Sequence, residues 1–285
     1  MKMEQAINLS FVQIRRGTDV RRSVTEALDL CRDAGFLRLD YLGDVTAPDY
    51  LERAKRDREA MDVRGMKVVQ SHCPFFRYKE NGLEKFNEFA PRAVDAAAVL
   101  GAEFLVIHAD EYRSGGAFDA EESLQQTREY LKPVVERCVQ KGIRPAIENL
   151  FEDRYGGPGR SRYTSEAEEV LAVLESFPGS GIGCCWDSGH HNVAFGEQCF
   201  FEKLEMLASY IVCTHMHDNQ YGSDLHKPAF FGTLNWEKIM SILKNAGYQG
   251  DFSWEFVYER VPDELYPEYL HFMHRIGEYL CREFD

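Results

Sequence analysis

Short apolar runs alternate with longer amphipathic segments along the whole chain. Eight runs have the composition of buried strands, and their centres lie 27 to 40 residues apart. This spacing is close to the roughly 30 residues that one strand and its following helix occupy. Such alternation is typical of a parallel sheet covered by helices. The eight runs are centred on Ile7, Leu39, Val69, Val106, Ala146, Cys185, Val212 and Phe252.

The segments between these runs carry helix start and stop signals. Ser23 to Glu26 has the pattern of a capping box, and Gly35 follows the apolar stripe it introduces. Residues 83–100 have apolar positions three and four apart before Gly101, and residues 235–243 lead in the same way to Gly247. The glycine-rich stretches 114–116 and 156–159 read as loops after strands. Eight strand–helix units predict an α/β protein with a (β/α)8 TIM barrel, in which residues 1–285 form a single domain.

Composition narrows the classes of protein. The 285 residues contain 33 Lys and Arg against 47 Asp and Glu, a formal net charge of −14, which disfavours a nucleic-acid partner. No apolar run approaches the ~20 residues of a membrane span, and the first residues lack the order of a signal peptide. We therefore expect a cytoplasmic protein without a membrane partner. The eight cysteines contain no C-x-x-C pair and read as free, mostly buried thiols.

Histidines and acids gather where the predicted strands end. Seven of the nine histidines lie at or just beyond such an end, and only His271 and His274 fall in the last predicted helix. In a barrel this edge is the active-site face. The ends of predicted strands three to eight are His72, His108, Glu148, Asp187, His215 and Glu255.

Strand alternation directs these side chains inward. Asp187 shares a face with Cys185, whereas Trp186 points to the helices; Glu255 likewise shares a face with Ser253. Carboxylates at a barrel mouth are costly to desolvate unless they are paired or bind a cation. Ligands with nitrogen and oxygen but no thiolate suit a divalent Mn, Zn, Co, Fe or Mg ion. Each histidine taken singly could instead be a hydrogen-bonded core residue, and we expect His191 and His217 to be outer or solvent-facing neighbours of His190 and His215.

Several motifs resemble the xylose isomerase-like barrel superfamily, which includes sugar phosphate isomerases and epimerases and endonuclease IV. The motifs are Ala146-Ile147-Glu148-Asn149, Trp186-Asp187-Ser188-Gly189-His190, His215-Met216-His217-Asp218-Asn219, Asp224-Leu225-His226 and Gly232-Thr233-Leu234-Asn235-Trp236. The resemblance to ketose 3-epimerases implies a metal held by Glu148, Asp187, His215 and Glu255. The resemblance to endonuclease IV implies a larger ligand set, to which His72, His108, His190, Asp224 and His226 also belong.

The favoured hypothesis is a metal-dependent isomerase or epimerase that acts on a sugar or sugar phosphate. Glu148 and Glu255 would be the base and acid of proton transfer through an enediolate. We expect His72, His108, His190 and His226 to contact the substrate. His190, Asp224 and His226 are also candidates for additional metal ligands. A homo-oligomer is compatible with the sequence.

The chain departs from the epimerase pattern at two substrate-contacting positions, which hold Arg154 and Tyr221 here. Arg154 is a candidate substrate anchor, as are Arg77, Arg160 and Lys227. Phe75, Phe76, Tyr155, Phe230 and Phe231 could shape a sugar pocket. The alternatives are a zinc phosphodiesterase acting on abasic DNA, a dehydratase of a sugar derivative and a non-catalytic carbohydrate-binding barrel. Neither the sugar nor the metal follows from the sequence.

Overall fold

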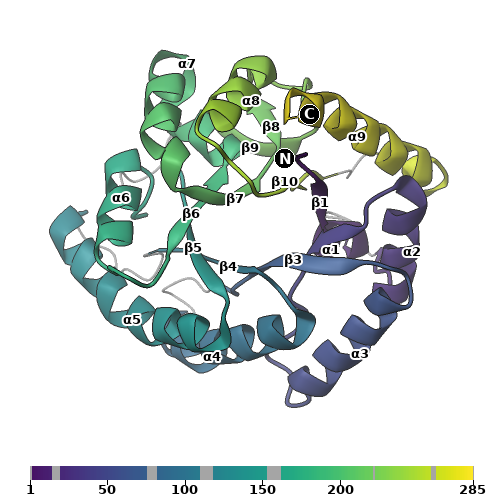
Figure 1. Cartoon of the computed structure of the whole chain (residues 1–285), viewed down its shortest axis with the longest axis horizontal. Coiled ribbons are helices and arrows are strands. Elements are labelled where there is room, and N and C mark those ends of the chain that lie inside the picture. Colours follow the sequence, from purple (N-terminus) through teal and green to yellow (C-terminus); the bar gives the residue numbers. More distant parts are fainter. Residues whose placement is uncertain are drawn as a thin grey trace.

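The chain forms a ring of parallel strands surrounded by helices (Figure 1). The computed structural model describes residues 2–14, 20–75, 82–109, 118–152, 162–220, 222–257 and 261–284. The strands are β1 (Gln5–Asn8), β2 (Arg38–Asp40), β3 (Lys67–His72), β4 (Phe104–Ile107), β5 (Arg144–Glu148), β6 (Gly183–Asp187), β7 (Ile211–His215), β8 (Asp218–Gln220), β9 (Ser223–Lys227) and β10 (Phe252–Trp254).

Eight of these strands make one sheet with the order β10-β1-β2-β3-β4-β5-β6-β7. The first and last strands of this order are joined through the residue after β7. The backbone N–H of Met216 donates to the Ser253 carbonyl at 2.7 Å, and the N–H of Glu255 donates to the Met216 carbonyl at 3.1 Å. These bonds close the sheet into a barrel, so the predicted α/β barrel and all eight predicted strand centres are confirmed.

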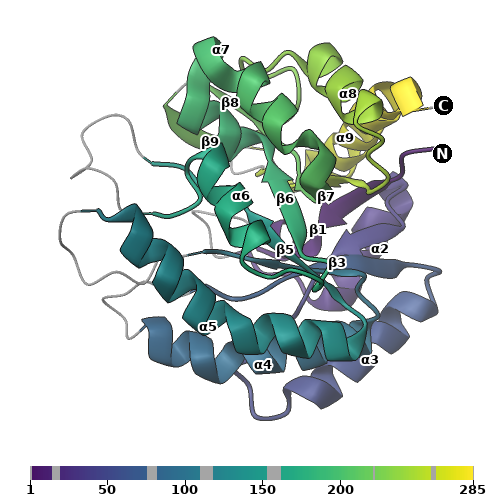
Figure 2. The same cartoon turned by 60° about the vertical axis from the view of Figure 1, so that its left-hand side comes forward.

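Helices cover the outside of the barrel (Figure 2). They are α1 (Leu9–Gln13), α2 (Val24–Ala34), α3 (Tyr50–Asp62), α4 (Gly82–Leu100), α5 (Ala120–Lys141), α6 (Ala167–Glu175), α7 (Ser188–Leu207), α8 (Trp236–Asn245) and α9 (Tyr266–Cys281), with 3-10 turns at Ala208–Tyr210, Asp263–Leu265 and Arg282–Phe284. The predicted helix signals are confirmed: Ser23 and Glu26 form both halves of a capping box, and Gly35 ends α2 in the left-handed conformation at φ 104°. Helix α7 is kinked at Gly196.

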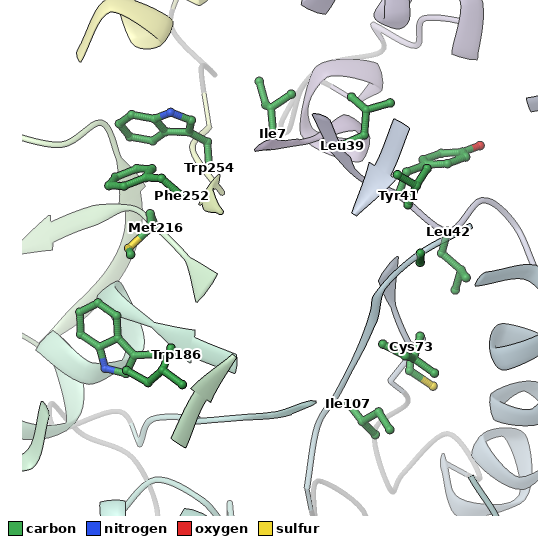
Figure 3. Packing of buried hydrophobic residues seen from close by; sticks show 14 of the residues in the cluster. Ile7, Leu39, Tyr41, Leu42, Cys73, Ile107, Trp186, Met216, Phe252 and Trp254 are labelled. Carbon is green, nitrogen blue, oxygen red and sulfur yellow. The ribbon is translucent and has the colours of Figure 1, made fainter. Parts of the chain in front are cut away.

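The large apolar side chains lie between the strands and the helices (Figure 3). Trp186 on β6 contacts His191 and Phe200 of α7, and Phe252 on β10 contacts Trp236 of α8. A separate cluster of mostly small buried residues comprises Val106, Ala146, Cys185, Val212 and Cys213, partly from the inward face of the strands. The outer layer therefore contains most of the buried apolar volume, and the inside of the barrel is narrow.

One element lies outside the eight predicted strand–helix units. Strands β8 and β9 form an antiparallel hairpin that packs against α7 (Figure 2). The eight cysteines, all within described residues, are free thiols as predicted. Within the described parts of the chain, no helix combines the length and the apolar character that crossing a membrane requires.

Candidate active site

Twelve polar side chains converge at the carboxyl end of the barrel. Six of them are the last residues of strands, and the others follow strands or lie on the β8–β9 hairpin; the six are Asn8, Asp40, His72, Glu148, Asp187 and His215. Most of them are almost completely buried, although all can form hydrogen bonds or carry charge. The full set is Asn8, Asp40, His72, His108, Glu148, Asp187, His190, His215, His217, Asp224, His226 and Glu255.

Glu148 lies at the centre of this cluster and has four histidine neighbours. Its Oε2 is 3.0 Å from Nε2 of both His72 and His108. Its Oε1 is 3.2 Å from Nδ1 of His190 and 3.2 Å from Nδ1 of His215. The side chain is 1% exposed, so these imidazoles replace the water that an exposed carboxylate would bind.

Asp187 begins the next part of the cluster and also caps helix α7. Its side chain accepts a hydrogen bond from the backbone N–H of His190 at 2.6 Å. Nε2 of His217 lies 3.1 Å from both carboxylate oxygens of Asp187. Asn149 ties Asp187 to β5, because its amide donates to the Asp187 carbonyl and accepts from the Asp187 N–H. Three elements therefore fix the position of this carboxylate.

The hairpin supplies Asp224 and His226. Nε2 of His226 is 3.2 Å from Oδ2 of Asp224, and Nδ1 of the same ring donates to the Glu255 carbonyl at 2.8 Å. The His226 ring stacks on His217 with a centroid distance of 4.0 Å. Nε2 of His190 approaches Asp224 to 3.8 Å. Strand β9 thus carries two residues into the cluster.

Burial and charge pairing act in opposite directions on these groups. Burial disfavours the charge of Glu148, but His215, His108 and His190 together hold the pKa of this carboxyl well below its ordinary value. Burial lowers the basicity of His190, but Asp187, Glu148 and Asp224 raise its pKa to about 10. The pKa values of His215 and His217 are also raised, despite burial, by neighbouring carboxylates. The histidines likewise hold the pKa values of Asp187 and Asp224 below their ordinary values, so Glu148, Asp187 and Asp224 have imidazolium groups as counter-charges.

The donor set fits a divalent metal ion. Overlapping groups of three residues present ligand atoms within 4.8 Å of one another, including Glu148, Asp187 and His190, and Asp40, His215 and Glu255. Nδ1 of His215 is buried without a hydrogen-bond partner and faces Glu148. Burial raises the pKa of the Cys185 thiol on β6 well above its ordinary value, and the groups of candidate ligands found among the described residues contain no cysteine. Nitrogen and carboxylate oxygen donors remain, as Mn, Zn, Co, Fe and Mg sites use.

A cavity of about 610 Å³ opens onto the cluster. Asn8, Asp40 and His72 form part of its wall, and residues of α3 such as Arg53 and Arg56 form another part. This volume falls within the ~300–1,000 Å³ typical of small-molecule sites. A second cavity, lined by Arg38, Arg144 and Asp251 among others, lies at the opposite end of the barrel and does not reach the histidine cluster.

The structure brings together most of the predicted site residues. Glu148, Asp187, His215 and Glu255 contact one another directly or through shared histidines. His72, His108, His190, Asp224 and His226 also lie in the cluster. Arg154, Arg77, Arg160, Phe76, Tyr155 and Tyr221 lie outside the described residues.

Two groups of predictions need correction. Phe230 and Phe231 contact Tyr279 and Phe272 on the outer helix α9, so their nearest aromatic partners are outside the barrel mouth. His217 is completely buried, and its contact with Asp187 excludes a solvent-facing role. His191 is also buried, and its Nε2 donates to the Phe200 carbonyl within α7. By contrast, Phe75 stacks on His108, with a centroid distance of 4.5 Å.

Sequence reasoning missed Asn8, Asp40 and Gln70. Asp40 accepts from Gln70 at 3.1 Å and from His215 at 3.2 Å, and Asn8 donates to Glu255 at 2.8 Å. The signal for Asp40 was present, because it is an acid at the end of a predicted strand, as Glu148 and Asp187 are. Asn8 and Gln70 are uncharged and carry no comparable signal.

The fold and the site together define the class of protein. It is a closed (β/α)8 barrel with carboxylates and histidines gathered at the carboxyl ends of its strands. The chain belongs to the xylose isomerase-like TIM barrel family, whose model matches residues 28–276.

Comparisons with solved structures agree with this fold. The chain is similar to a D-tagatose 3-epimerase-like protein, with a TM-score of 0.72, 21% identity and coverage of 99% of this chain and 100% of the other. It is also similar to a putative xylose isomerase from Rhodospirillum rubrum, with a TM-score of 0.77, 15% identity and coverage of 97% and 99%.

Curated relatives include an uncharacterized protein, MJ1311, from Methanocaldococcus jannaschii, which is 28% identical over 57% of this chain. A probable endonuclease 4 from Mesomycoplasma hyopneumoniae is 26% identical over 55% of this chain. The match spans 54% of the first relative and 56% of the second.

Proposed function

We propose that this protein is a metal-dependent isomerase or epimerase of a sugar or sugar phosphate. The observation that carries the proposal is the contiguous buried cluster formed by Glu148, Asp187, His215 and Glu255 from strand ends around the barrel. The similarity to solved sugar epimerases supports it at the level of the fold. The cavity that reaches the cluster supports a small-molecule substrate.

Glu148, Asp187, His215 and Glu255 would hold the ion. The bound ion would supply Lewis-acid polarisation of a sugar carbonyl. One of Glu148 and Glu255 removes the proton beside that carbonyl, and the other returns a proton to the resulting enediolate. Return to the same carbon gives epimerisation, and return to the neighbouring carbon gives isomerisation. His190 would donate to a developing oxyanion.

Incubation with free and phosphorylated ketoses in D2O with Mn²⁺ tests this proposal. We expect solvent deuterium to enter the reacting carbon, as followed by NMR. Glu255→Gln should reduce turnover by about 10²–10⁴-fold, because an amide cannot act as a base near neutral pH. Glu59→Gln, a matched change at an exposed position of α3, should leave turnover unchanged. Turnover without deuterium exchange would argue for a hydride shift instead, and full activity of Glu255→Gln would remove this residue from the chemistry.

A zinc phosphodiesterase acting on abasic DNA is the second candidate. Two observations favour it: all nine residues of the larger ligand set lie in one cluster, and the chain is similar to a probable endonuclease 4. The net charge of −14 opposes it, because cationic side chains dominate phosphate binding. We expect no useful incision of abasic DNA at low salt with added zinc. Robust incision that Glu148→Ala abolishes would reverse the ranking.

A further inference from the structure

The histidines of the cluster differ in the groups that their ring nitrogens contact. His72, His190 and His226 each place Nδ1 against a backbone carbonyl, at 2.8 Å, 3.0 Å and 2.8 Å respectively. In His215, Nε2 faces carboxylates instead: it lies 3.2 Å from Oδ2 of Asp40 and 3.6 Å from Oε1 of Glu255. Its Nδ1, the atom without a hydrogen bond, lies 3.2 Å from Oε1 of Glu148.

Asp40 is itself fixed by its surroundings. It ends β2, is 1% exposed and accepts hydrogen bonds from neighbouring side chains. Besides His215, Gln70 Nε2 donates to Oδ2 at 3.1 Å, and Asn8 Nδ2 lies at 3.4 Å. Gln70 also donates to the Thr214 carbonyl, which lies next to His215 in β7.

The orientation of Asn8 follows from a separate contact. Its Oδ1 accepts from the backbone N–H of Ser10 at 3.0 Å, so its Nδ2 points to Asp40 and Glu255. Three donors therefore converge on a single buried oxygen of Asp40. These contacts hold the Nε2 side of the His215 ring against Asp40.

We propose that Asp40 is a positioning residue that holds His215 with Nε2–H directed at its carboxylate, so that Nδ1 is the atom available to a metal. The inference rests on the proposed metal-dependent function. A carboxylate behind a ligating histidine orients the ring and raises its basicity, and loss of such a partner weakens metal binding by about 10–100-fold.

A different role for Asp40 makes a different prediction. Asp40, His215 and Glu255 also offer ligand atoms within 4.8 Å of one another, so Asp40 could bind an ion directly through the Nε2 side of the ring. A direct ligand would belong to the coordination sphere. A positioning residue would alter affinity without changing that sphere.

Co²⁺ binding to the full chain separates these roles, with affinity measured by chelator competition and coordination by the visible spectrum. Asp40→Asn should bind Co²⁺ about 10–100-fold more weakly than wild type with the same spectrum. Asp57→Asn is the matched control, because Asp57 lines the same cavity and is bonded to Tyr41 rather than to the cluster. Its Co²⁺ affinity should equal that of wild type.

Gln70→Leu protects the test against a folding defect in Asp40→Asn. It removes one donor to Asp40 but keeps Asp40 and His215, and we expect a loss of affinity of about tenfold or less with an unchanged spectrum. Unchanged affinity in both variants would overturn the proposal. A changed spectrum in Asp40→Asn would also overturn it, by making Asp40 a ligand. Failure of wild type itself to bind Co²⁺ would instead contradict the proposed function, and the role of Asp40 would fall with it.

Discussion

Gly189 is a position at which even the methyl side chain of alanine should disturb the site. It follows Ser188 at the start of α7, directly beneath the ring of His217. A Cβ atom at Gly189 would lie 1.8 Å from Cε1 and 2.3 Å from Nδ1 of His217. Ordinary contact begins at 3.4 Å, so the ring would have to move by about 1.6 Å.

His217 has no room for that movement. Its ring is completely buried, stacks on His226 at 4.0 Å and lies 3.1 Å from the oxygens of Asp187. Overpacking costs about 1–3 kcal/mol, and loss of a hydrogen bond to a charged group costs about 1.5–3 kcal/mol. We therefore expect Gly189→Ala to lower the free energy of unfolding by about 2.5–6 kcal/mol. Displacement of His217 should also weaken metal binding, because Asp187 loses a partner that fixes it.

Urea unfolding and Co²⁺ titration of the same samples measure both effects. Gly142→Ala is the control, because its left-handed backbone costs about 1–2 kcal/mol while its Cβ would meet nothing within 4 Å. Gly142 ends α5, on the side of the barrel away from the cluster, so its Co²⁺ affinity should stay at the wild-type value. Wild-type stability of Gly189→Ala would refute the packing argument, and lost stability with normal affinity would refute the link from His217 to Asp187.

Three further predictions concern capping, the metal and the two glutamates. Ser23→Ala should lower the free energy of unfolding by about 1 kcal/mol. The Ser23 hydrogen bonds to the Glu26 carboxylate hold the pKa of Glu26 below its ordinary value, so the part of the cap that depends on this carboxylate is present at neutral pH and lost as pH falls through that lowered value. The Ser23→Ala penalty should therefore shrink in acid to what the bond from the Glu26 N–H contributes, and a penalty that does not shrink would contradict this. Adding Mn²⁺ at 100 times its dissociation constant should raise the free energy of unfolding by about 2.7 kcal/mol, and EDTA should reverse the gain in a thermal melt. Without metal, Glu148→Gln should destabilise the protein by about 3–5 kcal/mol, because its histidine neighbours lose their counter-charge. Glu255→Gln should destabilise it less, so equal melting temperatures of the two variants would count against this.

The fold could be predicted because most barrel strands are short apolar runs with a polar residue at their end or directly after it. Residues 104–107, for example, form a strand with no competing helical period, and Gly101 separates this run from the preceding helix. The β8–β9 hairpin could not be predicted in the same way. Its segments are short and mostly polar, and the second strand is stabilised by contacts with α7 that sequence periodicity does not encode.

The site was predictable where the residue type itself carries charge. The rule that identified Glu148 and Asp187 also applies to Asp40, which ends the second strand. His217 could have been placed as well, because residues two apart on an extended segment share a face, and His215 was already expected to point inward. Phe230 shows the limit of the approach: its φ of 73° and the hydrogen bond from its N–H to Asp218 direct the loop toward α9, and neither follows from an aromatic residue near a strand end.

The separation of the two layers explains how the barrel can tolerate so polar a site. The apolar volume that stabilises the fold lies between strands and helices, where Trp186 and Trp254 are completely buried, and it does not depend on the barrel mouth. Inside the mouth, five carboxylates face six histidines, so imidazolium groups can offset the acids before any ion binds. An arriving metal would then displace protons from side chains that the backbone already holds in place, as the carbonyl partners of His72 and His226 illustrate. We therefore expect the barrel to fold without metal, with the ion adding stability and chemistry to a site whose geometry is already set.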